Sequence, residues 1–399
     1  MSDRDRTIQR FVVKVGSSVL TDERGRLLPE RIERLVEQVT QCSRDHHQPV
    51  LVSSGAIACG MATLGLLQRP RALAQLQACA AVGQSELMHL YAEAFARRGI
   101  LTAQVLLTQD DLASRARFRN AKQTLLTLLH RRVVPVINEN DTVAVEEITF
   151  GDNDRLAALV AAAVDAQLLV ILSDVDGFLI DGRPVERIEA MGSPRAAVRD
   201  PSTRARTASA GPSIGMSSQG SEQKMPALHG TRQTTKGGMA SKLEAARIVG
   251  HSGIPMVIAN GLKPSSLVEL LAGKPVGTLF VPPRTRLTSR KWWIAFSLRE
   301  PKGAVVVDAG AAEALLEKGK SLLASGVQEV KGRFAAGEFV AVVDGTGTEL
   351  ARGVCAFSSS ELARVRGMRS AEAAKTLGQS RSREVIHRDD LVLARELLR

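Results

Sequence analysis

Short apolar runs alternate with segments of helical period along the first 260 residues. We predict buried strands at 11–15, 50–52, 102–107, 133–137, 168–172 and 255–259, the last as the final central strand. We predict helices between them at 30–42, 72–97, 118–130 and 154–164. Parallel strands need long crossovers, which are usually helical. The alternation therefore predicts an α/β fold, a three-layer α/β/α sandwich with helices on both faces of a mainly parallel sheet.

The composition changes twice along the rest of the chain. Residues 192–236 are rich in Ser, Thr, Gly and Pro and contain few large apolar residues, which predicts a mobile surface insertion. Beyond residue 300, short apolar runs at 304–307 and 338–343 are separated by glycine-containing turns, which predicts a second, smaller, β-rich domain. We therefore expect a first domain over 1–281, a linker over 282–299 and a second domain over 300–399.

Several classes of protein are disfavoured by simple features. The N-terminus lacks the apolar segment of a secretory signal. The longest apolar stretch, 156–172, is interrupted by Asp165 and Gln167 and is too short for a membrane span. The 4 cysteines show no CxxC spacing, which favours buried free thiols. We therefore expect a cytoplasmic protein that does not associate with a membrane.

The net charge of +11 invites a nucleic-acid hypothesis, so its location matters. Residues 192–236 hold seven basic and two acidic side chains, whereas residues 300–399 hold 15 basic and 14 acidic ones. Because phosphate contacts need clustered Lys and Arg, the near-neutral second domain disfavours RNA as a partner.

Small and polar residues follow the predicted strands, at the sheet edge where open parallel sheets bind ligands. Glycines beside lysines suit phosphate, and the acidic and amide loops suit a small polar substrate. Each segment also has a structural explanation: a tight turn, a helix cap at Asp152 or Asn153, or an Asx turn at Asp141. The segments are Lys14-Val-Gly-Ser-Ser, Ser53-Ser-Gly-Ala, Asn138-Glu-Asn-Asp, Gly151-Asp-Asn-Asp and Thr235-Lys-Gly-Gly-Met-Ala-Ser-Lys242.

These segments, together with Ser173-Asp174 and Gly177, resemble in order the motifs of the amino acid kinase family. The similarity is greatest to the members that use ATP to phosphorylate the γ-carboxylate of free L-glutamate, the first step of proline biosynthesis. Two features depart from the family pattern: the long basic segment 192–236, and Thr235-Lys236 in place of the commoner Gly-Thr. Another amino acid kinase that phosphorylates a different substrate is the alternative within this class.

The second domain contains four further segments, Gly319-Lys-Ser-Leu-Leu, Val327-Gln-Glu-Val, Phe357-Ser-Ser-Ser-Glu361 and Glu384-Val-Ile-His-Arg-Asp-Asp390. These segments resemble those of a PUA domain, which many bacterial members of this glutamate-phosphorylating group carry. Because PUA domains elsewhere bind structured RNA, an RNA-binding or RNA-modifying protein is the alternative from a different class. The charge distribution disfavours it.

The resemblance implies a role for each matching residue. Lys14 and Lys242 would stabilise the transferring phosphoryl group, and Asp154 would orient both lysines. L-Glutamate would lie against Ser54, Asn138, Asp141 and Asn153. ATP would lie against Lys14, Gly16, Ser173, Asp174, Lys236, Gly237, Gly238, Met239, Ala240, Ser241 and Lys242.

The resemblance also implies partners, and the reaction it implies needs no general base from the protein. Mg²⁺ would bridge the nucleotide phosphates, with no residue of this chain assigned as its ligand. A homo-oligomer and feedback inhibition by L-proline are further expectations. Because a γ-carboxyl with a pKa of about 4.3 is already ionised at neutral pH, it can attack phosphorus without a general base.

Overall fold

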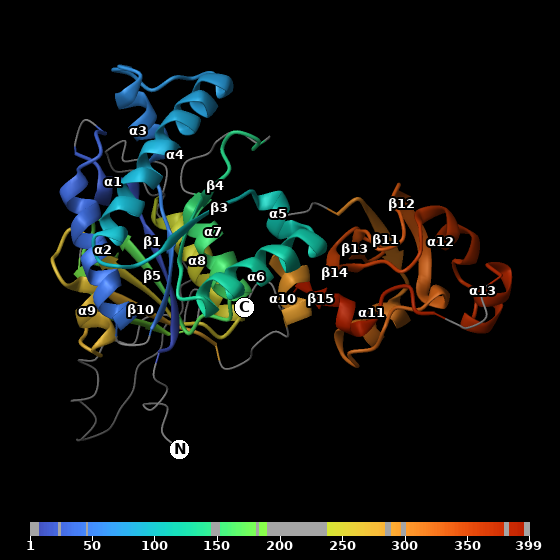
Figure 1. The fold of residues 1–399 in the computed structure, drawn as a ribbon. Coiled ribbons are helices and arrows are strands. Elements are labelled where there is room, and N and C mark those ends of the chain that lie inside the picture. Colours follow the sequence, from blue (N-terminus) through green and yellow to red (C-terminus); the bar gives the residue numbers. More distant parts are fainter. Residues whose placement is uncertain are drawn as a thin grey trace, which may run out of the picture.

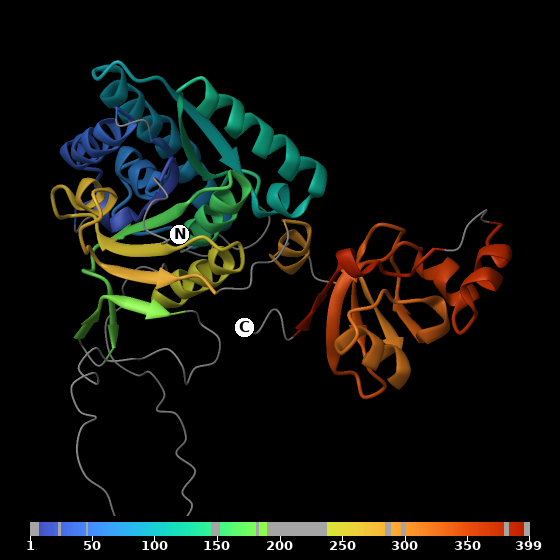
Figure 2. The same ribbon diagram turned by 90° about the horizontal axis from the view of Figure 1, so that it is seen from below.

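The computed structural model describes residues 8–22, 25–44, 47–144, 152–180, 183–189, 238–283, 289–296, 301–378 and 383–394. Two bodies are visible, each built on its own sheet (Figures 1 and 2). The predicted insertion at 192–236 lies outside the described residues.

The first body contains an eight-stranded sheet whose strands run in the order β3-β4-β2-β1-β5-β9-β10-β8. Every neighbouring pair is parallel except β9 and β10. The mainly parallel sheet is therefore confirmed, and the strands β10 and β8, which lie beyond β9, are additions to the prediction. The strands are β1 (Arg10–Val15), β2 (Gln48–Val52), β3 (Thr102–Leu107), β4 (Val134–Glu139), β5 (Leu168–Ser173), β8 (Arg187–Glu189), β9 (Met256–Asn260) and β10 (Thr278–Val281).

Helices cover both faces of this sheet, as the alternation predicted (Figure 1). Successive strand residues point to opposite faces, so Phe11 and Val13 of β1 enter one core and Val12 enters the other. The first core lies beneath α1 (Ser17–Leu20), α2 (Pro29–Arg44), α4 (Leu73–Ala96) and α9 (Ser266–Leu271). The second lies beneath α5 (Gln109–Ala113), α6 (Arg115–His130), α7 (Asp152–Ala163) and α8 (Met239–His251).

The short helix α3 (Ala56–Thr63) packs closely against α4 because both helices carry glycine at the contact. A Cβ on Gly60 would lie 1.8 Å from the Cys79 carbonyl oxygen, and a Cβ on Gly83 would lie 1.8 Å from the Ala56 oxygen. Any side chain would therefore force the two helices apart. This contact fixes the start of α3, which follows β2, against the middle of α4.

The second body is a five-stranded sheet in the order β12-β11-β13-β14-β15, antiparallel except for β11 and β13. Its core lies between this sheet and three short helices. The predicted β-rich second domain is thus confirmed. The elements are β11 (Gly303–Val307), α11 (Ala309–Leu316), β12 (Val327–Gly332), β13 (Phe339–Val343), β14 (Glu349–Val354), α12 (Ser359–Val365), α13 (Ser370–Thr376) and β15 (Leu391–Leu393).

The predicted linker contains a helix, α10 (Ser289–Phe296), which lies between the two bodies in Figure 2. Trp292 and Ile294 of this helix are buried. The 4 cysteines are free and buried, as expected from their spacing. Among the residues that the structure describes, no helix has the length and apolarity required to cross a membrane.

Candidate active site

A buried ion cluster joins three segments that lie far apart in the sequence. Asp154, near the start of α7, is fully buried, and the Lys14 side chain at the end of β1 approaches it with an Nζ–Oδ1 distance of 2.7 Å. Lys242, in the first turn of α8, lies 3.5 Å from Oδ2 of the same carboxylate. The Ser241 hydroxyl donates a hydrogen bond to Oδ2 at 2.7 Å. One carboxylate therefore holds two cations, as the sequence comparison implied.

The charges of this cluster depend on one another. Burial alone would raise the pKa of Asp154, but Lys14 and Lys242 outweigh it and hold that pKa below its usual range. Burial lowers the pKa of Lys14, and the repulsion from Lys242 adds to this, whereas Asp154 opposes both effects. Two cations and one anion leave an excess positive charge in a site sheltered from water. Such a site stabilises the additional negative charge of a phosphoryl group.

A second, uncharged cluster lies at the ends of the neighbouring strands β2 and β4. The side-chain amide of Asn153 lies within hydrogen-bond distance of the Ser54 hydroxyl at 3.0 Å and of the Asn138 Oδ1 at 3.1 Å. It also reaches the Ser53 carbonyl at 3.1 Å. The Asn153 Oδ1 is buried and has no hydrogen-bond partner in the described part of the chain. Because a buried carbonyl needs a donor, this atom favours a ligand that carries N–H groups.

Gly55 explains why Ser54 can face this cluster. Its φ of +103° lies in the region that side chains rarely adopt, and it turns the chain sharply from β2 into α3. The predicted tight turn is therefore present, in the same segment that is a candidate for ligand binding. The turn presents Ser54 at the carboxyl edge of the sheet.

Asp141 does not join the uncharged cluster directly. It lies in the turn after β4 and lines a pocket of about 300 Å³ that also contains Gln84 of α4. The Asn138 side-chain amide donates to Gln84 Oε1 at 2.7 Å, so Gln84 connects the pocket to the cluster. Burial raises the pKa of Asp141 to about 6, although the nearby Arg69 lowers it. A carboxylate with this raised pKa ionises more readily when a cation enters the pocket.

The residues predicted to contact ATP lie at the ends of β1 and β5 and at the start of α8. Gly16 follows β1, and its amide donates to the Leu172 carbonyl at 3.0 Å, so this glycine joins β1 to β5. The Ser173 hydroxyl donates to Asp174 at 3.1 Å, and the Asp174 carboxylate is exposed. Gly238 precedes α8, with Met239, Ala240 and Ser241 in its first turn. Lys236 and Gly237 lie outside the described residues.

Two side chains near Asp141 and Asn138 had no signal in the sequence. Gln84 is one polar residue within a 24-residue helix, and its spacing does not distinguish it from the other polar residues there. Arg69 lies between α3 and α4, in a segment without a predicted motif. Burial lowers the pKa of Arg69 to about 10, and Asp141 opposes this effect. Only the fold brings Gln84 to the pocket and Arg69 close to Asp141.

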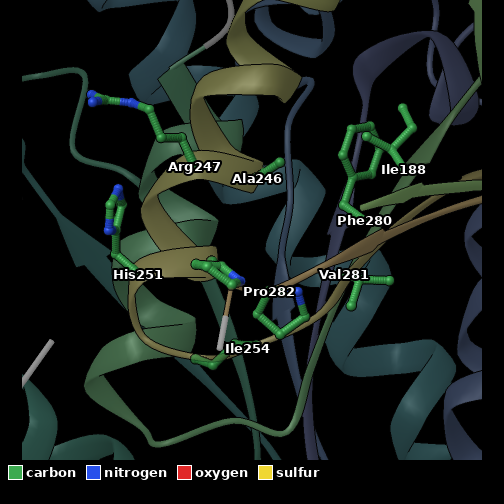
Figure 3. Close-up of a pocket in the computed structure, with 10 residues that line it drawn as sticks. Ile188, Ala246, Arg247, His251, Ile254, Phe280, Val281 and Pro282 are labelled. Atoms are coloured by element: carbon green, nitrogen blue, oxygen red, sulfur yellow. The ribbon is translucent and has the colours of Figure 1, made fainter. Parts of the chain in front are cut away.

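Another concavity, shown in Figure 3, lies beside the second half of α8 rather than at its first turn. Its walls include Ala246 and His251 of α8 and Phe280 of β10. A volume of about 30 Å³ suits water but not a nucleotide. It therefore does not compete with the ion cluster as the candidate active site.

Comparison with known proteins matches this architecture over both bodies. The model of the amino acid kinase family matches residues 9–260. This chain belongs to the amino acid kinase family. A PUA domain model matches residues 303–377, so this member of the amino acid kinase family carries a second recognised domain.

Curated members of the amino acid kinase family align with nearly the whole chain. A glutamate 5-kinase of Geobacter sp. (strain M21) is 45% identical over 387 residues, 97% of this chain and 98% of the relative. A glutamate 5-kinase of Thermus thermophilus is 46% identical over 388 residues, with the same two coverages, 97% and 98%. A glutamate 5-kinase of Salinispora arenicola is 46% identical over 393 residues, 98% of this chain and 100% of the relative.

Proposed function

We propose that this protein is an ATP-dependent glutamate 5-kinase, which converts L-glutamate to L-glutamyl 5-phosphate in the first step of proline biosynthesis. The observation that carries the proposal is the buried cluster of Lys14, Asp154 and Lys242 beside the uncharged cluster of Ser54, Asn138 and Asn153. The names of the full-length relatives support the same substrate.

The ion cluster of Lys14, Asp154 and Lys242 stabilises the negative charge of the transition state. The γ-carboxylate attacks the γ-phosphorus of ATP, the bond to the β,γ-bridging oxygen breaks, and ADP leaves. The transferred group passes through a loose transition state, so catalysis depends on positioning and on compensation of charge. Lys14 and Lys242 contribute that compensation. Asp154 keeps both ammonium groups charged and aimed at one point.

The uncharged cluster and the adjacent pocket hold the amino acid. Ser54, Asn138 and Asn153 can orient carboxylate oxygens without adding charge that would repel or trap them. The unpaired Asn153 Oδ1 and the Asp141 carboxylate are acceptors suited to the substrate ammonium group. This division supports an orientation with the γ-carboxylate of glutamate toward the lysines and its α-ammonium group toward Asp141.

The donor set fits a magnesium ion that enters with the nucleotide. No cluster of three or more His, Cys, Asp or Glu side chains able to hold a metal occurs among the described residues. Mg²⁺ is commonly held by substrate phosphates with only one or two carboxylates, and Asp174 is an exposed carboxylate at the end of β5. When bound, Mg²⁺ neutralises charge on the nucleotide phosphates.

The test is the release of ADP with L-glutamate, L-aspartate and N-acetyl-L-glutamate measured in parallel. Hydroxylamine traps the acyl phosphate. Of the three substrates, we expect only L-glutamate to yield a hydroxamate, γ-glutamyl hydroxamate. The folded Asp154→Asn variant is the control, and it should yield little hydroxamate. Faster ADP release with N-acetyl-L-glutamate would assign the chain to a different activity within the family.

The remaining expectations concern regulation, assembly and location. L-Proline added to the same assay should inhibit competitively with glutamate if it is a feedback inhibitor. Light scattering should give a mass above 42.8 kDa if the chain is a homo-oligomer. The cytoplasm is the expected location, because 4 buried thiols remain free.

A further inference from the structure

Helix α10 is buried on two faces, and each face contacts a different body of the protein. Trp292 is 4% exposed and packs into the core beneath α6, α7 and α8, where its ring lies 6.4 Å from that of Phe118. Ile294 is 1% exposed and packs against Phe339 of β13 and Val392 of β15. Two residues correspond to a rotation of about 200° around a helix, so the side chains point in nearly opposite directions. The helix therefore joins the core of the first body to the sheet of the second domain.

Trp292 also makes a specific contact with the last turn of α8. Its indole N–H donates to the carbonyl oxygen of Ile248 at 2.9 Å, in a buried position. The amide of Ser252, which would continue the helical pattern, instead donates to the carbonyls of Val249 and Gly250. Carbonyls in the last turn of a helix need outside partners. The indole of Trp292 supplies one for Ile248.

The other end of α8 carries the chemistry. Ser241 and Lys242 in its first turn contact Asp154. The helix rises 1.5 Å per residue, so Ile248 lies only about 9 Å along the axis from Lys242. The Lys242–Asp154 distance of 3.5 Å exceeds the Lys14–Asp154 distance of 2.7 Å. A small axial shift of α8 would therefore change the weaker of the two ion pairs.

We propose that Trp292 is a positioning residue for phosphoryl transfer. Its hydrogen bond to Ile248 fixes the axial position of α8 and thereby the position of Lys242 relative to Asp154. Because Ile294 of the same helix packs against the second domain, the position of α8 also depends on how the second domain packs against α10. The inference rests on the proposed kinase activity, because it assigns Lys242 a role in catalysis.

The first experiment removes the N–H and retains the ring. Site-specific replacement of Trp292 by 3-benzothienylalanine puts sulfur in place of the indole N–H, and the same replacement at Trp293 is the matched control. Loss of one neutral hydrogen bond should lower kcat about 3- to 10-fold and leave the glutamate KM within about twofold. Trp292→Phe, which retains an aromatic ring without a donor, should give the same pattern.

The decisive measurement combines this replacement with Lys242→Met. If Trp292 acts through Lys242, removing its N–H should cause no further loss of kcat in the Lys242→Met protein. If Trp292 only fills the core, its replacement should lower the melting temperature. It should then lower kcat by the same factor in the unaltered protein and in the Lys242→Met protein. That additive result, an unchanged kcat after the first replacement, or an equal loss from the Trp293 control overturns the inference.

The contribution of the second domain is tested with a pair of truncations. Ile294→Ala should lower kcat about 2- to 5-fold by loosening α10. Val365→Ala, in the core of the second domain but outside α10, should lower the melting temperature and leave kcat unchanged. Equal kcat values for these two variants would overturn the dependence on the second domain. Absence of γ-glutamyl hydroxamate from the unaltered protein would instead overturn the proposed function, so the two failures are distinguishable.

Discussion

Asp141→Asn separates two effects of a partly buried carboxylate: its free-energy cost in the free protein and its benefit when substrate is bound. Burial raises the pKa of Asp141 from 3.8 to about 6, which corresponds to about 3 kcal/mol. The folded protein binds this proton more tightly than the unfolded chain does. Stability due to that proton is complete below pH 3.8 and is lost as the pH rises through about 6. Asp141→Asn should therefore raise the free energy of unfolding by up to about 3 kcal/mol at pH 8 and change it little at pH 4.

The same substitution should weaken glutamate binding. Loss of a buried partner for the substrate ammonium costs roughly 2 to 4 kcal/mol, which predicts a glutamate KM about 30- to 1,000-fold higher at pH 7 and a small change in the KM for ATP. In the unaltered protein, the glutamate KM should rise about tenfold between pH 7 and pH 5, because protonated Asp141 cannot pair with the ammonium. The Asn variant should lack this rise.

The assays are urea unfolding and steady-state ADP release, each from pH 4 to pH 8, with Glu37→Gln as the matched control. Glu37 is an exposed carboxyl on α2, outside the site, so its amide should change neither quantity. An Asp141→Asn protein that is less stable at pH 8, or that keeps the pH dependence of the glutamate KM, would refute the assignment of Asp141.

Three further outcomes follow from the buried contacts. Asp154→Asn should lower kcat at least ~100-fold. It should also shift the alkaline limb of the pH–rate profile to lower pH, because Lys14 loses the carboxylate that raises its pKa. An alkaline limb at unchanged pH would contradict this role of Asp154. Lys14→Met or Lys242→Met should each lower kcat at least ~100-fold with the glutamate KM within a few-fold, and an unchanged kcat would remove either lysine from the mechanism. Gly83→Ala should lower the melting temperature by several degrees, because a Cβ would lie 1.8 Å from the Ala56 oxygen, whereas Gly345→Ala, with open space around its Cα, should not.

The sequence predicted those features that depend on local pattern. Lys14, Asp154 and Lys242 were found because each lies in a short motif at the end of a strand or the start of a helix, and the fold brings all three together. The central strands were predicted for a similar reason, since a strand buried on both faces is a continuous apolar run.

The features that escaped prediction depend on distant contacts. Gln84 of α4 contacts Asn138 of β4 across 54 positions of sequence, and neither element indicates this contact alone. The edge strand β8 has three residues, too few for a periodic pattern. No helix was predicted in the linker. Trp292 and Ile294 pack against different bodies, so the apolar residues of α10 do not form a single face.

The order of the site residues along the chain has a consequence for biosynthesis. Ser54, Asn138 and Asn153, which we propose to bind the amino acid, all precede Lys242 in the sequence. The central strand β1 pairs with β5, whose residues follow about 150 positions later, so even the first half of the site closes over a long loop. The residues that we propose to bind the amino acid are therefore synthesised before the second lysine. Until α8 docks against α7, the carboxylate of Asp154 pairs with Lys14 alone, so the charge compensation that we propose for phosphoryl transfer is incomplete.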